Sequence, residues 1–367
     1  MPKYHVGANG PAVCKAVKIA CRFDSHGTQA EMLQVWEAIQ EATHQNALTG
    51  VSKPRSADLS AFEAGLKAEM LEEFREAQLD SHLGSTEEQA IALRLAEGAD
   101  HRLSYAPVAF KDPNWRVESA TSVTRCELTT GGAGYFKSYV EDDDHAGAFD
   151  GYGMSALSAG IAEVNAYRLA KLFGEGYDEL VPETAFRAVY GEVGTLQKEV
   201  KPDREILSDY EANPALQEDF RNAAIFDFVI GNMDRHSENY IYEPEGEGRA
   251  RRNRIRLIDN SFSFPAHSGQ DVVNESIFAD NYGSRAGYDL KSKRSIPSYH
   301  LHIDDMRLKV KDLRKLAAVR EGVARWIEEG TIAPDRGAAT LERIDLLLKK
   351  KRIQSLSDFL ETKFVKR

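Results

Sequence analysis

A short polar loop at residues 231–239, GNMDRHSEN, holds the densest group of side chains able to do chemistry. It follows the largely apolar stretch 213–230, which is typical of a buried helix. A separate carboxylate, Asp259, comes directly after the apolar run 255–258, where a strand would end. A strand end fixes the backbone and leaves the side chain open to a ligand. Asp and Asn are hard oxygen ligands, so this pattern favours magnesium or manganese over zinc.

Each of these carboxylates also has a purely structural interpretation. Asp234 could cap a turn after the helix, and Asp259 could be a β-turn residue, because Asp is common in both places. What favours chemistry is their combination with Asn239 in one short region of the chain.

Two sequence motifs carry a resemblance to a known group of enzymes. DRHSEN at 234–239, followed by LIDNSFSF at 257–264, resembles the catalytic and metal loops of atypical kinases. The nearest are the phosphatidylinositol 3/4-kinase-like families and their bacterial relatives, with the HipA and Fam20 kinases more distant. The resemblance implies an α+β, bilobal protein-kinase-like fold, with an antiparallel β-sheet N-lobe, a mainly helical C-lobe and a helical N-terminal extension.

The same resemblance assigns roles within the two loops. Asp234 would accept the proton of the attacking hydroxyl or orient that hydroxyl. Asn239 and Asp259 would hold one or two Mg²⁺ or Mn²⁺ ions that bridge the phosphates of ATP. Arg235 would brace the loop, and His236 would contact the transferred phosphate or pack beneath the loop. Relatives often have Gly two positions after the metal-binding Asp, where this chain has Ser261.

Upstream segments resemble the nucleotide-binding parts of these kinases. Lys137, in GYFKSY, would hold the α- and β-phosphates, and Glu163, in a helical segment, would orient that lysine. The turn at 118–125, ESATSVTR, would cover the phosphates, and residues 196–199 would line the adenine through backbone groups. The implied nucleotide contacts are Ser119, Thr121, Ser122, Lys137, Leu196, Gln197 and Glu199.

Hydrophobic periodicity supplies the elements that must position these residues. Helical patterns are predicted near 32–39, 59–74, 85–95, 158–173 and 213–230, and from about 302 to the end. Ser85 and Glu88 form a predicted capping box. Strands are predicted at 115–119, 123–129, 135–140, 180–181, 186–190 and 194–200, with GGAG at 131–134 as a hairpin turn and a later hairpin over 240–242 and 255–258. We expect a helical N-terminal extension (1–104), an N-lobe (105–200) and a C-lobe (201–367).

Composition bounds the function classes. The 367 residues carry 47 Lys and Arg against 58 Asp and Glu, a net charge of −11, so a dedicated nucleic-acid binder is not expected. The chain has 3 cysteines, so a disulfide framework is not expected. We expect a cytoplasmic location, where thiols stay reduced. Cys14 and Cys21 could form a metal pair with His5 and His26, although their spacing is not a common zinc spacing. No apolar run is long enough to span a membrane.

Three functions remain open from the sequence. The first is an ATP- and magnesium-dependent kinase, with a protein Ser or Thr hydroxyl as the expected acceptor. The second is another transfer on the same fold, either of AMP or to a lipid or small molecule. The third is a non-catalytic kinase-like scaffold or assembly protein, with the N-terminal helices as the docking surface for a partner.

Overall fold

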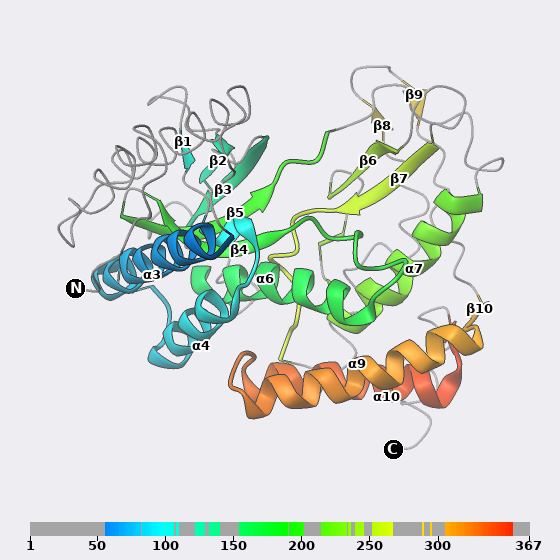
Figure 1. Ribbon diagram of the computed structural model, residues 1–367. Coiled ribbons are helices and arrows are strands. Elements are labelled where there is room, and N and C mark those ends of the chain that lie inside the picture. Colours follow the sequence, from blue (N-terminus) through cyan, green and yellow to red (C-terminus); the bar gives the residue numbers. More distant parts are fainter. Residues whose placement is uncertain are drawn as a thin grey trace. The chain divides into compact units, whose positions relative to one another are not determined.

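The protein was analysed as a computed structural model (Figure 1). The structure describes residues 56–81, 83–105, 108–109, 122–128, 132–139, 154–189, 191–201, 214–232, 234–235, 239–245, 252–266, 288–289, 294–295 and 305–354. The predicted helix near 32–39, the predicted strand at 115–119 and the cysteines Cys14 and Cys21 lie outside these residues.

Contacts divide the chain into two compact units. Unit 1 comprises Met1–His82, Ala96–Glu141 and Ala185–Glu199. Unit 2 comprises Leu83–Leu95, Asp142–Thr184 and Val200–Arg367. This division differs from the expected boundary at residue 104, because the helices on either side of residue 82 fall into different units. It also places the helix with Glu163 in unit 2, although we expected that helix in the N-lobe.

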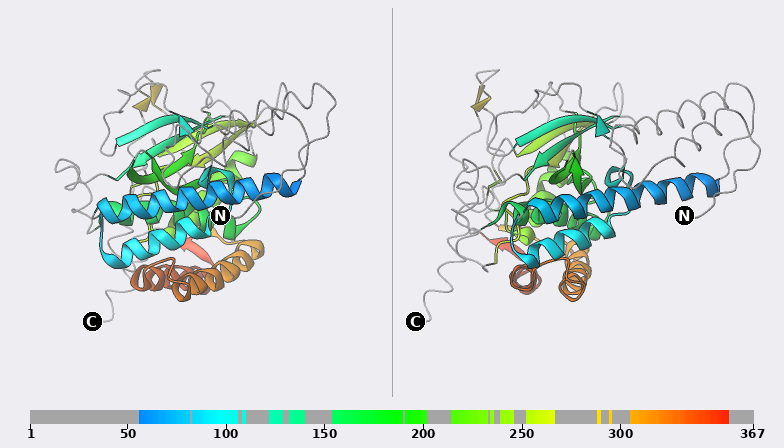
Figure 2. Two further views of the ribbon diagram at one scale, coloured as in Figure 1. Left: turned by 60° about the vertical axis from the view of Figure 1, so that its left-hand side comes forward. Right: turned by 90° about the vertical axis from the view of Figure 1, so that its left-hand side faces the viewer.

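Unit 2 is mainly helical. Its principal helices are α4 (Thr86–Gly98, which ends in unit 1), α6 (Ala156–Phe173), α7 (Pro214–Ile230), α9 (Val310–Glu328) and α10 (Pro334–Lys350). Helices α9 and α10 lie side by side in both views of Figure 2. The antiparallel hairpin of β6 (Tyr240–Glu245) and β7 (Arg252–Leu257) contacts α7. Small two-stranded sheets join β8 (Tyr288–Asp289) to β9 (Arg294–Ser295) and β10 (Asp305–Arg307) to β11 (Arg352–Gln354).

Local capping explains where two of these helices begin. The predicted capping box is confirmed: Glu88 N–H donates to Ser85 Oγ (3.2 Å), and Ser85 N–H donates to Glu88 Oε2 (2.7 Å). Glu88 Oε1 also accepts hydrogen bonds from the hydroxyls of Ser155 (3.0 Å) and Ser158. Ser155 is the N-cap of α6, because its Oγ accepts from Ser158 N–H (3.0 Å). One carboxylate therefore ties the start of α4 to the start of α6.

Unit 1 is built on a five-stranded sheet of order β1-β2-β3-β5-β4. Its strands are β1 (Val108–Ala109), β2 (Ser122–Leu128), β3 (Ala133–Ser138), β4 (Thr184–Val189) and β5 (Glu192–Lys198). The pairs β1–β2, β2–β3 and β3–β5 are antiparallel. The predicted turn at GGAG is confirmed, since Gly132 takes a positive φ of 96° and its carbonyl accepts from Leu128 N–H (3.1 Å).

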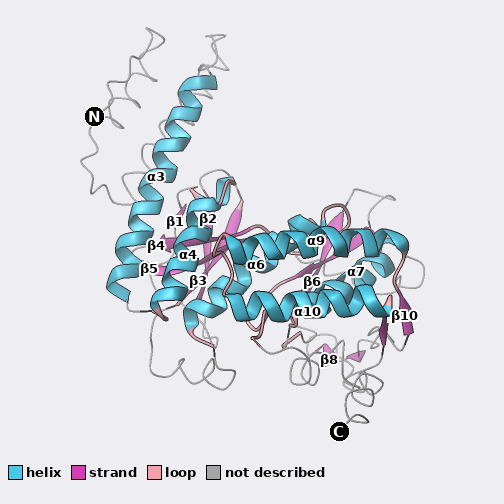
Figure 3. Cartoon of the chain, turned by 90° about the horizontal axis from the view of Figure 1, so that it is seen from below, coloured by secondary structure: helices cyan, strands magenta, loops and turns pink. Residues whose placement is uncertain are grey.

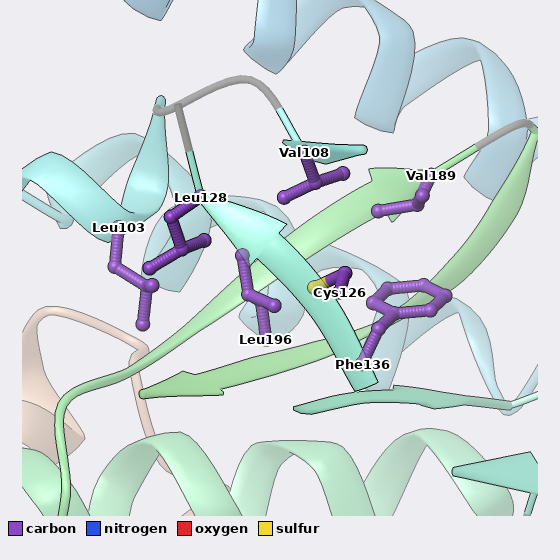
Figure 4. Packing of buried hydrophobic residues seen from close by; sticks show 7 residues of the cluster. All are labelled: Leu103, Val108, Cys126, Leu128, Phe136, Val189 and Leu196. Carbon is purple, nitrogen blue, oxygen red and sulfur yellow. The ribbon is translucent and has the colours of Figure 1, made fainter. Parts of the chain in front are cut away.

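One face of this sheet carries a hydrophobic core. Figure 4 shows the cluster, whose members are Leu103, Val108, Cys126, Leu128, Phe136, Val189 and Leu196. Because side chains alternate along a strand, the neighbours of Phe136 on β3, Tyr135 and Lys137, point to the opposite face. The register places Lys137 between Val123 of β2 and Thr195 of β5. We call this second side the polar face of the sheet.

Helix α3 (Ser56–Ser81) belongs to unit 1 because its buried side chains complete the packing around the sheet. The Phe74 ring lies 5.6 Å from the ring of Phe186 on β4, centroid to centroid. The fully buried Arg187 donates to Met70 Sδ (2.8 Å) and to the carbonyl of Leu103 in the short 3₁₀ helix η1 (Arg102–Ser104) (3.0 Å). These contacts place α3 in one compact unit with the sheet.

The predicted α+β class is confirmed, with an antiparallel sheet in one unit and a mainly helical second unit. Several boundaries move by a few residues: α6 begins before Ser158, and β5 covers Glu192–Lys198 instead of 194–200. In the described part of the chain, no helix has the length and apolar character needed to cross a membrane.

Candidate active site

The β6–β7 hairpin brings the two expected metal ligands to the same end of one element. Asn239 directly precedes β6 and Asp259 follows β7, and the register pairs Tyr240 with Leu257. The antiparallel pairing continues one step further, because the Ile258 N–H donates to the Asn239 carbonyl (3.0 Å). Residues separated by the whole hairpin therefore lie beside each other at its open end.

The side chain of Asn239 is held in a fixed orientation. It is buried, and its Nδ2 donates to the carbonyl of Asp234 at 2.6 Å. Because the NH₂ group is used in this bond, Oδ1 is the atom that could coordinate a cation. The same bond fixes the backbone of Asp234, which is half-buried at the start of the loop.

Arg235 connects the segments that form this end of unit 2. Its side chain is fully buried and pairs with Asp227 of α7, Nε to Oδ2 at 2.9 Å and Nη2 to Oδ1 at 3.2 Å. Nη1 donates to the carbonyls of Asn239 (2.6 Å) and Ile258 (2.5 Å). Nη2 also donates to Asn260 Oδ1 (2.5 Å). All five guanidinium donors are thus used by protein acceptors, which makes Arg235 a positioning residue.

Burial and the neighbouring guanidinium have opposite effects on the Asp227 carboxyl of the Arg235–Asp227 ion pair. Burial raises the pKa of the Asp227 carboxyl, and the Arg235 guanidinium acts in the opposite direction. A planar guanidinium with two bonds to one carboxylate is the geometry that compensates best for lost hydration. The pair therefore joins the last turn of α7 to the loop, at the cost of burying two charges.

The loop at Asp259 has an unusual backbone conformation, and a serine hydroxyl connects two of its carboxylate neighbours. Asp259 takes a positive φ of 51°, a left-handed conformation that Asp tolerates better than most residues. The buried Ser261 hydroxyl lies 3.1 Å from Asp259 Oδ1 and 3.0 Å from Oε1 of the buried Glu163 on α6. Since the hydroxyl has one proton, it can donate fully to only one carboxylate at a time. Ser261 does not have a positive φ, so a side chain at position 261 causes no backbone strain of this kind.

Two further residues hold this site, although the sequence analysis gave neither of them a role. Asn232 is completely buried; its Oδ1 accepts from Asp234 N–H (2.9 Å), and its Nδ2 donates to Ser263 Oγ (3.2 Å). Arg343 of α10 donates through Nε to the Val229 carbonyl (2.9 Å) at the end of α7. Asn two residues before Asp is a recognisable turn pattern, whereas nothing local in the sequence identifies Arg343.

In unit 1, the structure places several of the expected nucleotide-binding residues on one sheet. Lys137 is half-buried on the polar face of the sheet. Gln197 of β5 is on the same face, where it is paired with Tyr135 of β3. Ser122 is the first residue of β2, opposite Ser138. Ser119 and Thr121 lie outside the described residues, as does His236 of the loop in unit 2.

Two expectations for the adenine-lining segment change. The Leu196 side chain belongs to the hydrophobic core, on the face opposite to Lys137. The Glu199 N–H donates to the Ala133 carbonyl (2.9 Å), so it is not available to a base. The Glu199 carboxylate accepts two bonds from Arg125 (2.6 and 3.2 Å). Strand β5 is interior in the sheet, and its backbone groups are used in pairing.

Asn239 and Asp259 are the expected ligands of a magnesium ion in unit 2. Among the residues that the structure describes, no group of three or more His, Cys, Asp or Glu could hold a metal. Asn239 and Asp259 offer hard oxygen atoms, and Mg²⁺ is usually bound by one or two carboxylates together with substrate phosphates. An open pair of this kind is suited to a cation that arrives with a nucleotide.

Comparisons with known proteins find similarity to solved structures and not to family models or curated sequences. No model of a known protein family matches the chain, and no curated protein matches its sequence. The chain is similar to the crystal structure of a Helicobacter pylori proinflammatory kinase, CtkA, with 12% identity and a TM-score of 0.35. The similarity covers 68% of this chain and 94% of that one. Because a score this low carries no weight by itself, we base the proposed function on the residues of the two units.

Proposed function

We propose that this protein is an ATP- and magnesium-dependent phosphotransferase of the atypical, phosphatidylinositol-kinase-like type. The main support is the open end of the β6–β7 hairpin, which brings Asn239 beside the Asp259 segment through the Ile258–Asn239 backbone bond. Phosphoryl transfer needs positioning and charge neutralisation more than covalent chemistry. The fixed backbone of Asp234 and the oxygen donors of Asn239 and Asp259 support the proposal on both points.

The residues of unit 2 would divide the work as follows. Asn239 and Asp259 would hold Mg²⁺, which when bound neutralises charge on the phosphates. Asp234 would accept the proton of the attacking hydroxyl, from a backbone fixed by Asn232 and Asn239. Arg235 keeps these segments in register without taking part in the transfer, because its donors are all used.

In unit 1, we propose that Lys137 contacts the nucleotide phosphates. Its place on the polar face, away from the core that contains Phe136 and Leu196, supports this role. Gln197 is on the same face and is the proposed contact for the base. The pairing of Glu163 with Lys137 remains a prediction. Within unit 2, Glu163 is a hydrogen-bond partner of Ser261.

The test is the intact mass of the full-length protein after incubation with ATP and magnesium, beside a binding assay with a fluorescent ATP analogue. Asp234→Asn is expected to bind nucleotide normally and to transfer no phosphate. Asp259→Asn is expected to lose the magnesium-dependent part of binding. Asp100→Asn, whose side chain is 95% exposed in unit 1, is the matched control and should behave as the wild type.

The acceptor we propose is a protein Ser or Thr hydroxyl. The assay therefore includes a general protein substrate, and phosphoinositide vesicles form a second arm. Addition of AMP in place of phosphate would identify nucleotidyl transfer instead. Failure to bind the ATP analogue under any metal condition would refute the proposal and favour a scaffold.

A further inference from the structure

Cationic side chains gather at one end of unit 2, where α9 begins and α10 ends. Figure 3 shows this end beside β10. We call the cluster the basic tip. Its members are Arg307, Lys309, Lys311, Lys349, Lys350, Lys351 and Arg352. Because the whole chain carries a net charge of −11, this concentration of positive charge runs against the general balance.

Backbone pairing brings the two parts of the basic tip together. The register of β10 and β11 sets Arg307 directly opposite Arg352, and Leu308 N–H donates to the Lys351 carbonyl (3.0 Å). The neighbouring Ile353 is buried, so alternation turns the two arginines to the other face of the ribbon. Like charges directly opposite each other destabilise a strand pair. An anionic surface that contacts this face would meet both guanidinium groups.

One carboxylate of the described residues serves two members of the basic tip. Glu218 accepts hydrogen bonds from both Lys309 (2.7 Å) and Lys311 (2.6 Å). Partial burial acts to raise the pKa of Glu218, but the two ammonium groups prevail and lower it to about 2. One carboxylate shared by two lysines leaves an excess of positive charge.

Helix stability accounts for some of these lysines and not for others. Lys349 and Lys350 lie in the last turn of α10, where cations interact favourably with the helix dipole. Lys309 and Lys311 are at the N-terminal end of α9, where the same dipole disfavours them. Glu218 compensates for this in part, because it accepts hydrogen bonds from both lysines.

An exposed apolar side chain lies between these two lysines. Val310, the first residue of α9, is 65% exposed, and in the described part of the chain only Tyr135 is another exposed large hydrophobic residue. A purely ionic partner, such as an acidic protein segment, would gain nothing from this side chain. An anionic lipid surface can bind both the lysines and Val310, because its headgroups attract cations and its interfacial layer accepts small apolar groups.

We propose that the basic tip binds the surface of an anionic membrane, with Val310 entering the headgroup region. The net negative charge of the chain does not prevent this, because charges are screened beyond about 8 Å at physiological ionic strength. The proposed contact is peripheral and reversible. It does not depend on the proposed kinase activity, because it requires no nucleotide.

The test is co-sedimentation of the full-length protein with phosphatidylcholine vesicles that contain or lack phosphatidylserine. Wild type is expected to bind only the vesicles with phosphatidylserine and to dissociate as salt is raised. The variant Lys349→Glu/Lys350→Glu should bind at least about tenfold more weakly. Lys171→Glu/Arg325→Glu is the matched control, because it makes the same charge change in the last turns of α6 and α9. Equal loss in the control would refute the proposal.

The variant Val310→Ala distinguishes binding to a membrane from binding to a soluble polyanion. It does so without changing the charge of the protein. It should weaken vesicle binding severalfold and leave binding to polyglutamate unchanged. Wild-type binding to polyglutamate without binding to vesicles would overturn the membrane proposal in favour of an acidic protein partner. Circular dichroism of each variant ensures that the comparison is between folded proteins.

Discussion

The buried guanidinium of Arg235 offers the sharpest test of how the candidate site is held together. The substitution Arg235→Met keeps much of the apolar volume and removes every donor. It leaves the Asp227 carboxylate, which has 0% exposed side-chain surface, without the guanidinium that compensates for its burial. The carbonyls of Asn239 and Ile258 and the side-chain oxygen of Asn260 each lose the hydrogen-bond donor that Arg235 supplied.

The expected cost follows from the buried charge. Removing one partner of a buried ion pair destabilises a protein by about 3–5 kcal/mol, because the remaining charge has no compensation. For a folding unit of this size, each kcal/mol lowers the unfolding midpoint by about 2–4 °C. We therefore expect the transition of unit 2 in Arg235→Met to fall by about 10 °C at pH 7.

The loss should depend on pH in a defined direction. Without Arg235, burial alone acts on Asp227 and raises its pKa in the folded state above the unfolded value of about 3.9. A carboxyl whose folded pKa is raised destabilises the fold at every pH above the unfolded pKa. The deficit of the variant should therefore be greatest at pH 7 and should shrink as the pH falls toward about 4.

Thermal unfolding followed by circular dichroism at several pH values measures this. Adding Asp227→Asn to Arg235→Met should recover part of the lost stability, since the uncompensated charge is removed. Arg343→Met is the matched control, because its buried guanidinium donates to the Val229 carbonyl and to Thr340 Oγ1, and Asp227 keeps its bonds to Arg235. A deficit in Arg235→Met that is below about 1 kcal/mol, or equal at pH 4 and pH 7, would refute the reasoning.

Further changes test other parts of the structure. Ser261→Ala should raise the magnesium concentration needed for nucleotide binding severalfold, and Ser261→Thr should restore it, as measured by titration. Cys126, whose pKa burial raises to about 11, should resist alkylation at pH 8 in the folded protein and react after denaturation, as shown by peptide mass analysis. Gly194→Ala should lower the unfolding midpoint, because its Cβ would lie 2.6 Å from the Phe136 ring. Glu218→Gln should destabilise at pH 7 and lose its effect as the pH falls from about 4.5 toward 2, seen in urea midpoints.

Several features of this protein could be predicted from short stretches of sequence. The capping box of Ser85 and Glu88, the turn at Gly132 and a strand that carries Lys137 all form as expected. Each depends on the backbone preferences of a few neighbouring residues, which are the same in a peptide and in a protein. The composition of the loop around Asp234 likewise identified the region where a site could lie.

Tertiary structure decided what those local features contact. Ser261 reaches Glu163 across 98 residues, and Arg343 caps α7 from 114 residues away. Helix α3 joins the sheet of unit 1 because Phe74 meets Phe186, which no periodicity in either segment indicates. The basic tip forms because α9 packs against α10 and β10 pairs Arg307 with Arg352. The physical reason is the same each time: sequence patterns give the face that a segment will bury, whereas the identity of the opposing face depends on packing between distant segments.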